Sequence, residues 1–304
     1  MRAVDVVLLG AAAMVAVLVV GHDWVPDVGG LGVLLDSVAP WLGVGVPVLV
    51  LVAVACRSRL GVVAAVVVPL LAWGYAFGGW WAGTGPQAVG AGRLNVVTQN
   101  LSAANDDPRE AVRVLRATGA DLIALQEVSW RNAGAVEEGL SGVYPYHAQE
   151  GTVGLWSRYP ISGTEPVDVG VGWRRGLRAR VDVPGGPLTV HVVHLPSIRL
   201  GASGTRDRGL ATLSEELTAD SDRRGVVLGD FNTTATDRHW EGFAPGYHDT
   251  RSAGRGPQFT WPAWFPMLGP DHILARGLRP ISSAALAAPG SDHRGLEATL
   301  ALEP

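Results

Sequence analysis

Residues 226–232 read Val226-Val227-Leu228-Gly229-Asp230-Phe231-Asn232, the pattern of a buried strand that ends in a polar turn. The apolar run is short and β-branched, as a buried strand requires, and Gly229 permits a sharp turn. In extended geometry Asp230 and Asn232 point to the same side. The aspartate can hold a water molecule or a metal ion there, and the asparagine can donate to a phosphate oxygen. A simple Asx turn at a strand end would give the same short pattern.

Other predicted strands also end in polar residues. The strand predicted over 94–100 ends in Asn100, and the strand predicted over 121–126 is followed by Glu127. A predicted hairpin over 176–194 ends in His194. An asparagine and a glutamate on neighbouring strands form a candidate site for a hard metal ion. Mg²⁺ is commonly held by one or two carboxylates together with substrate phosphates.

The C-terminal part adds Asp-His pairs at strand entries. Asp271 precedes the apolar run 273–275, and Ser291-Asp292-His293 precedes a last predicted strand over 296–302. Such a pair can supply a general acid or base, or a phosphate-binding imidazole whose tautomer a carboxylate fixes. A polar loop would show the same three residues.

Helices are predicted between these strands. Residues 108–117 follow Asp107, which can cap a helix, and begin with Pro108, which suits a first helical turn. Residues 206–219 have an amphipathic pattern and lead into the strand that carries Asp230.

The N-terminal third has a different composition. Three apolar runs, Val6–Val20, Ala39–Cys56 and Leu60–Trp81, each approach the roughly 20 residues that a helix needs to cross a bilayer. We therefore predict a membrane domain over 1–82 with three transmembrane helices, a Gly-rich linker over 83–92 and a catalytic domain over 93–304. The first run could instead be a signal peptide, and a buried helical hairpin is the alternative for the whole region.

Basic residues predict the orientation of these spans. Arg2 precedes the first span, and Arg57 and Arg59 lie between the second and the third, whereas the loop 21–37 carries aspartates and no arginine. Because basic loops stay cytoplasmic, three crossings would place everything after Trp81 outside the cytoplasm. The expected location is the cell membrane, as a multi-pass protein with an extracytoplasmic catalytic domain.

Charge and cysteine content exclude several classes of function. The 304 residues carry a net charge of −4, so no overall basic field indicates a nucleic-acid partner. Cys56 is the one cysteine, which excludes an intrachain disulfide and makes a cysteine metal site implausible. A lipid bilayer is the expected partner, and no protein partner is inferred.

The order of these polar residues resembles the endonuclease/exonuclease/phosphatase superfamily, whose members include DNase I-like nucleases, inositol polyphosphate 5-phosphatases and sphingomyelinases. The resemblance covers about residues 93–302. It implies an α/β fold, a DNase I-like two-sheet β-sandwich flanked by helices, here preceded by three transmembrane helices. It also implies a phosphoesterase that depends on Mg²⁺, or on Mn²⁺ as a second hard cation that accepts the same ligands. The positions that carry the resemblance are Asn100, Glu127, His194, Asp230, Asn232, Asp271, Ser291, Asp292 and His293.

The resemblance also implies roles for these residues. The metal group would be Glu127 as principal ligand, with Asn100 close by and Asp292 as a second carboxylate. In the catalytic group, Asp230 would orient and deprotonate the attacking water.

Four further residues would contact or organise the phosphate. Asn232 would contact the scissile group, and His293, oriented by Asp271, would donate to a phosphate oxygen. His194 would be a phosphate contact or an acid. A metal and an imidazole would neutralise the equatorial oxygens while a carboxylate aims the water.

The layout of three spans before this domain resembles the teicoplanin-resistance-type membrane phosphoesterases of actinomycetes, which act on a polyprenyl pyrophosphate carrier lipid. That resemblance implies an undecaprenyl-pyrophosphate-like substrate and a role in cell-wall lipid recycling. Arg175 and Arg178 are candidates to bind a diphosphate, and Trp261 and Trp264 are candidates to meet a lipid or the interface. An extracytoplasmic nuclease, a phospholipid or sphingomyelin phosphodiesterase and a non-catalytic membrane scaffold remain alternatives.

Overall fold

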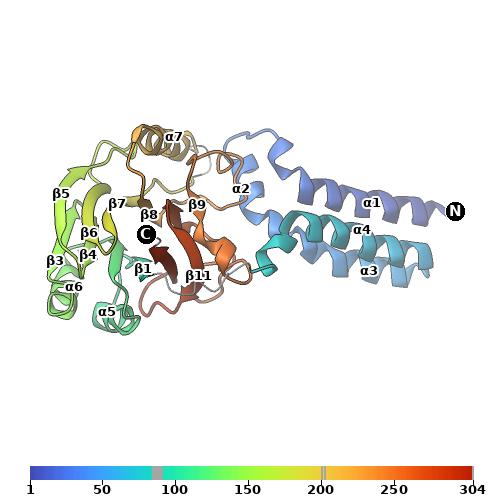
Figure 1. Ribbon diagram of the computed structural model, residues 1–304. Helices are drawn as coiled ribbons and strands as arrows, with labels where there is room; N and C mark the ends of the chain where they lie inside the picture. The colour runs from blue at the N-terminus through green and yellow to red at the C-terminus, as the bar shows by residue number, and fades with distance from the viewer. Residues whose placement is uncertain (84–91, 200, 202, 303–304) are drawn as a thin grey trace.

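The structure is a computed structural model that describes residues 1–83, 92–199, 201 and 203–302. Within these residues two six-stranded sheets pack face to face and are flanked by helices, which confirms the predicted two-sheet α/β sandwich. A bundle of N-terminal helices projects from one side of this domain (Figure 1).

The first sheet, sheet A, has the strand order β11-β12-β1-β2-β4-β3. β1 and β2 are parallel, and every other neighbouring pair is antiparallel. Its strands are β1 (Gly92–Asn100), β2 (Leu122–Gln126), β3 (Tyr146–Glu150), β4 (Val153–Ser157), β11 (Arg279–Leu286) and β12 (Gly295–Leu302).

The second sheet, sheet B, has the order β5-β6-β7-β8-β10-β9. Here β7 and β8 form the parallel pair, and the other neighbours are antiparallel. Its strands are β5 (Ile161–Pro166), β6 (Gly176–Val183), β7 (Gly186–His194), β8 (Gly225–Asp230), β9 (His248–Asp249) and β10 (Asp271–Arg276).

The central strands are buried on both faces, as their unbroken apolar runs require. On β8, Leu228 packs between the sheets while Val227 faces the helix α7 (Gly204–Ala219). The outer face of sheet A packs in the same way on α5 (Pro108–Ala117) and α6 (Ala133–Leu140). The predicted cap of α5 is present, because the Asp107 side chain accepts a hydrogen bond from the backbone N–H of Glu110.

Among the described residues, three helical stretches are long and apolar enough to cross a membrane: 3–20, 31–55 and 59–81. They comprise α1 (Ala3–Val20), α2 (Leu31–Val38), α3 (Gly45–Ala55) and α4 (Arg59–Phe77), with 3₁₀ turns at His22–Trp24, Ala39–Val44 and Gly78–Trp81. Residues 84–91, most of the predicted linker, lie outside the described part of the chain.

The second stretch differs from the prediction. Its helical region begins at Leu31, whereas the apolar run predicted a start at Ala39, and 3₁₀ turns at 39–44 interrupt it. Pro40 has no backbone N–H to donate, which disfavours a continuous α-helix at this point. In the sequence, the charge of Asp36 excluded residues 31–38 from the apolar run. The residue that pairs with this charge lies far along the chain, so no local pattern indicates it.

That partner is Arg238, in the loop after β8. Its guanidinium donates to both carboxylate oxygens of Asp36 at 2.6 and 3.1 Å, and His22 Nδ1 lies 2.9 Å from the same carboxylate. Arg238 also donates to the backbone oxygen of Val25 at 2.7 Å. The Asp36 side chain has no exposed surface, so a buried ion pair joins the helical segment to the sandwich.

Candidate active site

The strand registers bring the polar residues to one edge of the sandwich. In the parallel pair of sheet A, Asn100 lies opposite Gln126, the residue before Glu127. In the parallel pair of sheet B, His194 lies opposite Asp230. Parallel strands end at the same edge of a sheet, so each pair places its terminal residues side by side.

Two antiparallel strands add their starting residues to this edge. Asp271, the first residue of β10, lies opposite Asp230. His293 stands two residues before β12, which runs antiparallel to β1. An antiparallel strand begins where its neighbour ends, so the same edge collects both residues.

Asp230 joins the two sheets through its carboxylate. It is buried, and its Oδ2 accepts a hydrogen bond from Asn100 Nδ2 at 3.0 Å while its Oδ1 accepts from the backbone N–H of Asn232 at 2.9 Å. Burial raises the pKa of Asp230 to about 7, in spite of the nearby charge of His293. A carboxylate of this pKa is suited to accept a proton near neutral pH.

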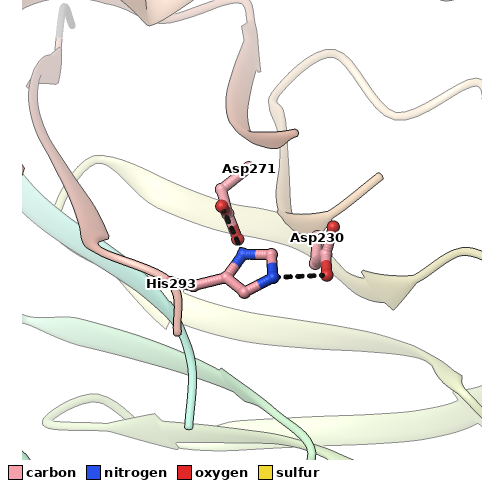
Figure 2. A group of neighbouring side chains, drawn as sticks. All are labelled: Asp230, Asp271 and His293. Carbon is pink, nitrogen blue, oxygen red and sulfur yellow. Dashed lines mark hydrogen bonds and ion pairs between the residues drawn. The ribbon is translucent and has the colours of Figure 1, made fainter. Parts of the chain in front are cut away.

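His293 lies between two carboxylates (Figure 2). Its Nδ1 is 2.9 Å from Asp271 Oδ2, and its Nε2 is 3.7 Å from Asp230 Oδ2. Burial alone would lower the pKa of His293, but the charges of Asp271 and Asp230 outweigh it and raise the pKa to about 10. The imidazole is therefore protonated at neutral pH and can donate from Nε2 while Asp271 holds Nδ1.

Glu127 occupies a strained position at the end of β2. Its φ is 57°, a left-handed conformation uncommon for a residue with a side chain. Its Oε2 accepts from the backbone N–H of Ala103 at 2.7 Å and its Oε1 from Asn100 Nδ2 at 3.2 Å, while Asn132 donates to its backbone oxygen at 2.9 Å. Such strain persists only where the surroundings enforce it, which is common at functional sites.

The donor set fits a hard divalent cation. The carboxylates of Glu127 and Asp230 converge on the single amide of Asn100, and about a third of the Glu127 side chain is exposed. Oxygen ligands with concentrated negative charge are those that Mg²⁺ prefers. Asn100 is oriented as a donor to both carboxylates, because its Oδ1 accepts from the backbone N–H of Ser102.

Asp230, Asp271 and His293 also lie close enough together to ligate a metal. We assign this trio to proton transfer instead. Both ring nitrogens of His293 face carboxylates and the imidazole is protonated, so it has no free lone pair for a metal. Glu127 is the better metal ligand.

His194 stands between the carboxylates of Asp230 and Glu127. Its Nε2 is 3.5 Å from Asp230 Oδ2 and 3.9 Å from Glu127 Oε1. Burial, together with the charges of Arg175 and His293, lowers the pKa of His194 well below its usual 6.5, so the ring is neutral. A neutral imidazole has one N–H to donate and carries no positive charge.

The two candidate arginines lie in different places. Arg175 is buried close to the site: burial lowers the pKa of its guanidinium, and the charges of Asp230 and Glu127 partly offset that effect. Arg178 is not brought to the site, because its guanidinium pairs with Asp222 at 3.0 Å and lies 3.7 Å from Asp220. Arg175 is therefore the candidate that remains for an anionic substrate.

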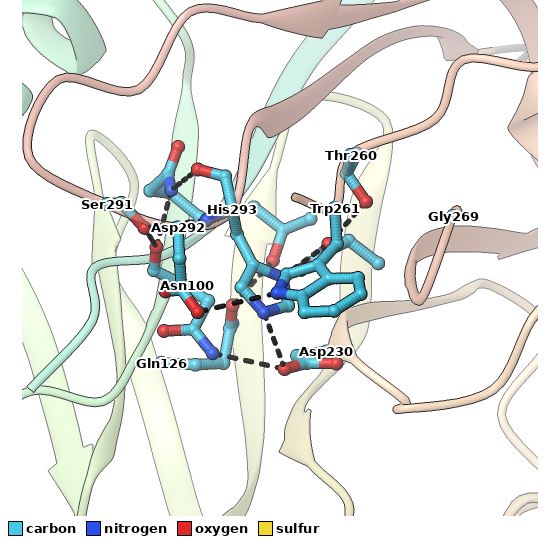
Figure 3. Close-up of polar contacts among 12 residues, drawn as sticks. Asn100, Gln126, Asp230, Thr260, Trp261, Gly269, Ser291, Asp292 and His293 are labelled. Carbon is cyan, nitrogen blue, oxygen red and sulfur yellow. Dashed lines mark hydrogen bonds and ion pairs between the residues drawn. The ribbon is translucent and has the colours of Figure 1, made fainter. Parts of the chain in front are cut away.

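The aromatic residues border the site. Trp261 Nε1 donates to Asp292 Oδ2 at 3.4 Å, which ties the indole to the residue before His293 in the chain (Figure 3). Asp292 is exposed. Trp264 is 84% exposed, which leaves its ring free to meet a ligand or a lipid.

The turn after β8 differs from the expected extended geometry. Asn232 has a φ of 47°, and its side chain donates to the backbone oxygen of Leu195 at 2.9 Å. Because the backbone N–H of Asn232 donates to Asp230 Oδ1, the turn is of the Asx type. Gly229 is needed because a Cβ there would lie 1.9 Å from the backbone oxygen of Val193, so close packing of β7 on β8 requires the glycine.

Two residues that the sequence did not indicate contact the relay, the name used here for the connected side chains of Asp271, His293 and Asp230. Thr260 Oγ1 donates to Asp271 Oδ2 at 2.6 Å, and Gln99 Nε2 donates to the backbone oxygen of His293 at 3.1 Å. Thr260 lies in a loop without periodicity. Gln99 reads as an ordinary member of β1. Neither residue carried a signal in the sequence.

Known proteins share both the sequence pattern and the fold of this domain. The profile described as "Endonuclease/Exonuclease/phosphatase family" matches residues 97–293, a span that includes the relay and Glu127. No curated protein matches the sequence of this chain.

Solved structures share the fold at low sequence identity. D. rerio TDP2 complexed with single strand DNA product is 19% identical, with a TM-score of 0.59, covering 68% of this chain and 98% of that one. An endonuclease/exonuclease/phosphatase from Beutenbergia cavernae is 20% identical (TM-score 0.55, 69% and 71% covered). One from Bacteroides vulgatus is 15% identical (TM-score 0.59, 70% and 100% covered).

Proposed function

Because the chain belongs to the endonuclease/exonuclease/phosphatase family, whose fold indicates a hydrolase of phosphoester bonds, we propose that it is a metal-dependent lipid phosphatase. Its substrate is a pyrophosphate of the undecaprenyl pyrophosphate type. Its N-terminal helices hold it in the membrane, and its catalytic domain works on the extracytoplasmic side. In this role it would recycle a cell-wall carrier lipid, as in glycopeptide resistance of the teicoplanin type.

In the proposed reaction, water attacks the terminal phosphorus of the pyrophosphate, Asp230 takes a proton from that water, and the P–O bond to the lipid monophosphate breaks, which releases inorganic phosphate. His293, fixed by Asp271, donates to an oxygen of the phosphate, and neutral His194 adds a second donor. Asn232 lies in the turn directly after Asp230, and Arg175 adds positive charge. Glu127, with Asp292 as a further carboxylate, would hold Mg²⁺ or Mn²⁺, which supplies Lewis-acid stabilisation of the phosphate charge when bound.

The observation that carries phosphoester hydrolysis is the Asp271–His293–Asp230 relay beside Glu127. It places a protonated donor and a base of raised pKa at one edge of the sandwich. The lipid substrate is supported by the exposed Trp264 and by Trp261, which is bonded to Asp292 at the same edge. Aromatic side chains of this kind favour a membrane interface.

The test is hydrolysis by the detergent-purified full-length protein, with and without Mg²⁺, read as inorganic phosphate from the isoprenyl lipid, as nicking of the plasmid and as phosphocholine from sphingomyelin. C55 isoprenyl pyrophosphate, plasmid DNA and sphingomyelin are offered in parallel. We expect metal-dependent release from the isoprenyl lipid. Cleavage of sphingomyelin alone would transfer the proposal to a phospholipid phosphodiesterase, and silence on all three would contradict a hydrolase.

A nuclease is the second candidate, because one structural relative is D. rerio TDP2 with a single-strand DNA product. The net charge of −4 argues against it, since binding to a phosphate backbone depends on basic residues. Nicking of the plasmid in the same assay, without release from the lipid, would favour the nuclease.

A further inference from the structure

We propose that Trp41, in the N-terminal helical segment (residues 3–81), is a positioning residue for the catalytic relay. It acts through the active-site hairpin, defined here as residues 259–268. The helical segment then supports catalysis as well as holding the protein in the membrane. The inference rests on the proposed function of the site, but one arm of its test does not.

Trp41 holds the outer side of the hairpin. Its indole Nε1 donates to the backbone oxygen of Met267 at 2.7 Å. Its ring lies 5.9 Å from the ring of Phe259 and 6.4 Å from that of Phe265, measured between centroids. Trp80, at the end of the third helical stretch, packs edge-on against Phe259 at 5.9 Å. The 3₁₀ turn within the second helical stretch and the end of the third therefore both contact the hairpin.

The hairpin transmits this position across its own hydrogen bonds. The backbone N–H groups of Thr260 and Trp261 donate to the oxygen of Leu268 at 2.8 and 2.9 Å, and Met267 N–H donates to the oxygen of Trp261 at 2.8 Å. A shift of Met267 therefore moves Thr260 and Trp261 with it.

The inner side of the hairpin contacts the relay at three points. Thr260 Oγ1 donates to Asp271 Oδ2, the oxygen that holds His293. The backbone oxygen of Thr260 accepts from Arg294 N–H at 2.7 Å, and Ala263 N–H donates to the backbone oxygen of Asp292 at 2.7 Å. Both neighbours of His293 in the chain are thus bonded to the hairpin that Trp41 holds.

The test compares Trp41→Phe, Trp41→Ala and a matched control, Trp73→Phe, in the full-length protein. Trp73 donates its indole N–H to the backbone oxygen of Pro40 at 2.9 Å. Its described ring contacts are Phe77 and Trp81. The control removes a bond of the same kind from the same segment without touching the hairpin.

Activity is measured on bis(p-nitrophenyl) phosphate with Mg²⁺, a soluble probe that needs no bilayer. We expect kcat of Trp41→Phe to fall about fivefold with KM little changed, the size of one neutral hydrogen bond. Trp41→Ala, which also loses the ring contacts, should fall further, so Phe restores part of the loss. Trp73→Phe should keep the kcat of the unmodified protein.

Hydrogen exchange of the hairpin amides tests the same coupling without turnover. The amides of Thr260, Trp261 and Leu268 should exchange faster in Trp41→Ala and at the original rate in Trp73→Phe. Unchanged kcat and exchange in both Trp41 variants would overturn the proposal, as would a loss of kcat in Trp73→Phe without faster exchange of the hairpin amides. If the unmodified protein cleaves neither this diester nor the isoprenyl pyrophosphate, the proposed function fails, and the exchange result alone decides whether Trp41 positions the hairpin.

Discussion

At the scale of single residues, the chemistry depends on which of two buried groups holds a proton. The pKa of Asp230 is raised to about 7 and that of His293 to about 10. Between these values Asp230 is a free base and His293 a charged donor. The site is therefore in its working protonation state over a mildly alkaline range.

Replacing Asp230 with Asn should remove the base and keep the fold. We expect kcat to fall by about 10²- to 10⁴-fold, the usual contribution of a general base. Asp182→Asn, the same change on the exposed side of β6, is the control and should keep full activity. Full activity in Asp230→Asn would contradict the assignment of the base.

The same variant should not be less stable at pH 8. The pKa of Asp230 lies above its ordinary 3.8 in the folded protein, so the folded state binds this proton more tightly than the unfolded state does. The stability that this group contributes is complete below the unfolded pKa and is lost as pH rises through the folded pKa. An amide has no such loss. A midpoint of thermal unfolding at pH 8 clearly below that of the unmodified protein would contradict the buried carboxylate.

The pH profile of kcat/KM should rise as Asp230 loses its proton and fall as His293 loses its own. In His293→Gln the imidazolium charge that lowers the pKa of Asp230 is gone, so the acidic limb should move to higher pH. The measurement is a profile from pH 5 to 11 on the soluble probe. An acidic limb at an unchanged pH would show that the charge of His293 does not affect the pKa of the catalytic base.

At the scale of secondary-structure elements, local signals predicted individual helices and strands but not their registers. Asp107 and Pro108 marked the start of α5, and the run before Asp230 marked β8, because a cap and a β-branched apolar run act over a few residues. The pairing of Thr260 with Asp271 depends on the hairpin bonds to Leu268, and no short pattern encodes those. α2 was missed for a similar reason, since Asp36 reads as a loop residue until Arg238 neutralises it.

The Asp36–Arg238 pair makes a prediction at this scale. Arg238→Ala leaves the buried carboxylate with His22 and the backbone N–H of residue 238 but without the guanidinium, and breaking such a pair costs about 3 kcal/mol of unfolding free energy. Arg109→Ala removes an arginine from an exposed pair with Glu138 and should cost less than about 1 kcal/mol. Denaturant unfolding in detergent measures both. Equal, small losses would show that the buried pair is not a structural link.

At the scale of the whole molecule, the proposed orientation can be read from cysteine labelling of intact cells. Cys56 is exposed and adjoins Arg57, so a membrane-impermeant maleimide should not reach it from outside. Ser141→Cys, at an exposed position after α6, in a Cys56→Ser background should react. Cys56 should react once the cells are permeabilised. Labelling of Cys56 in intact cells would reverse the orientation.

The pairing of β1 with β12 has a consequence for biosynthesis. These strands are neighbours in sheet A although β1 is the first strand of the domain in the sequence and β12 is the last. During translation the nascent domain must wait for its last strand before sheet A can close. His293 adjoins that strand, so the nascent chain gains catalytic competence only as synthesis of this domain finishes. Until then the sandwich is open and inactive, and β1 is paired on one side only, with β2.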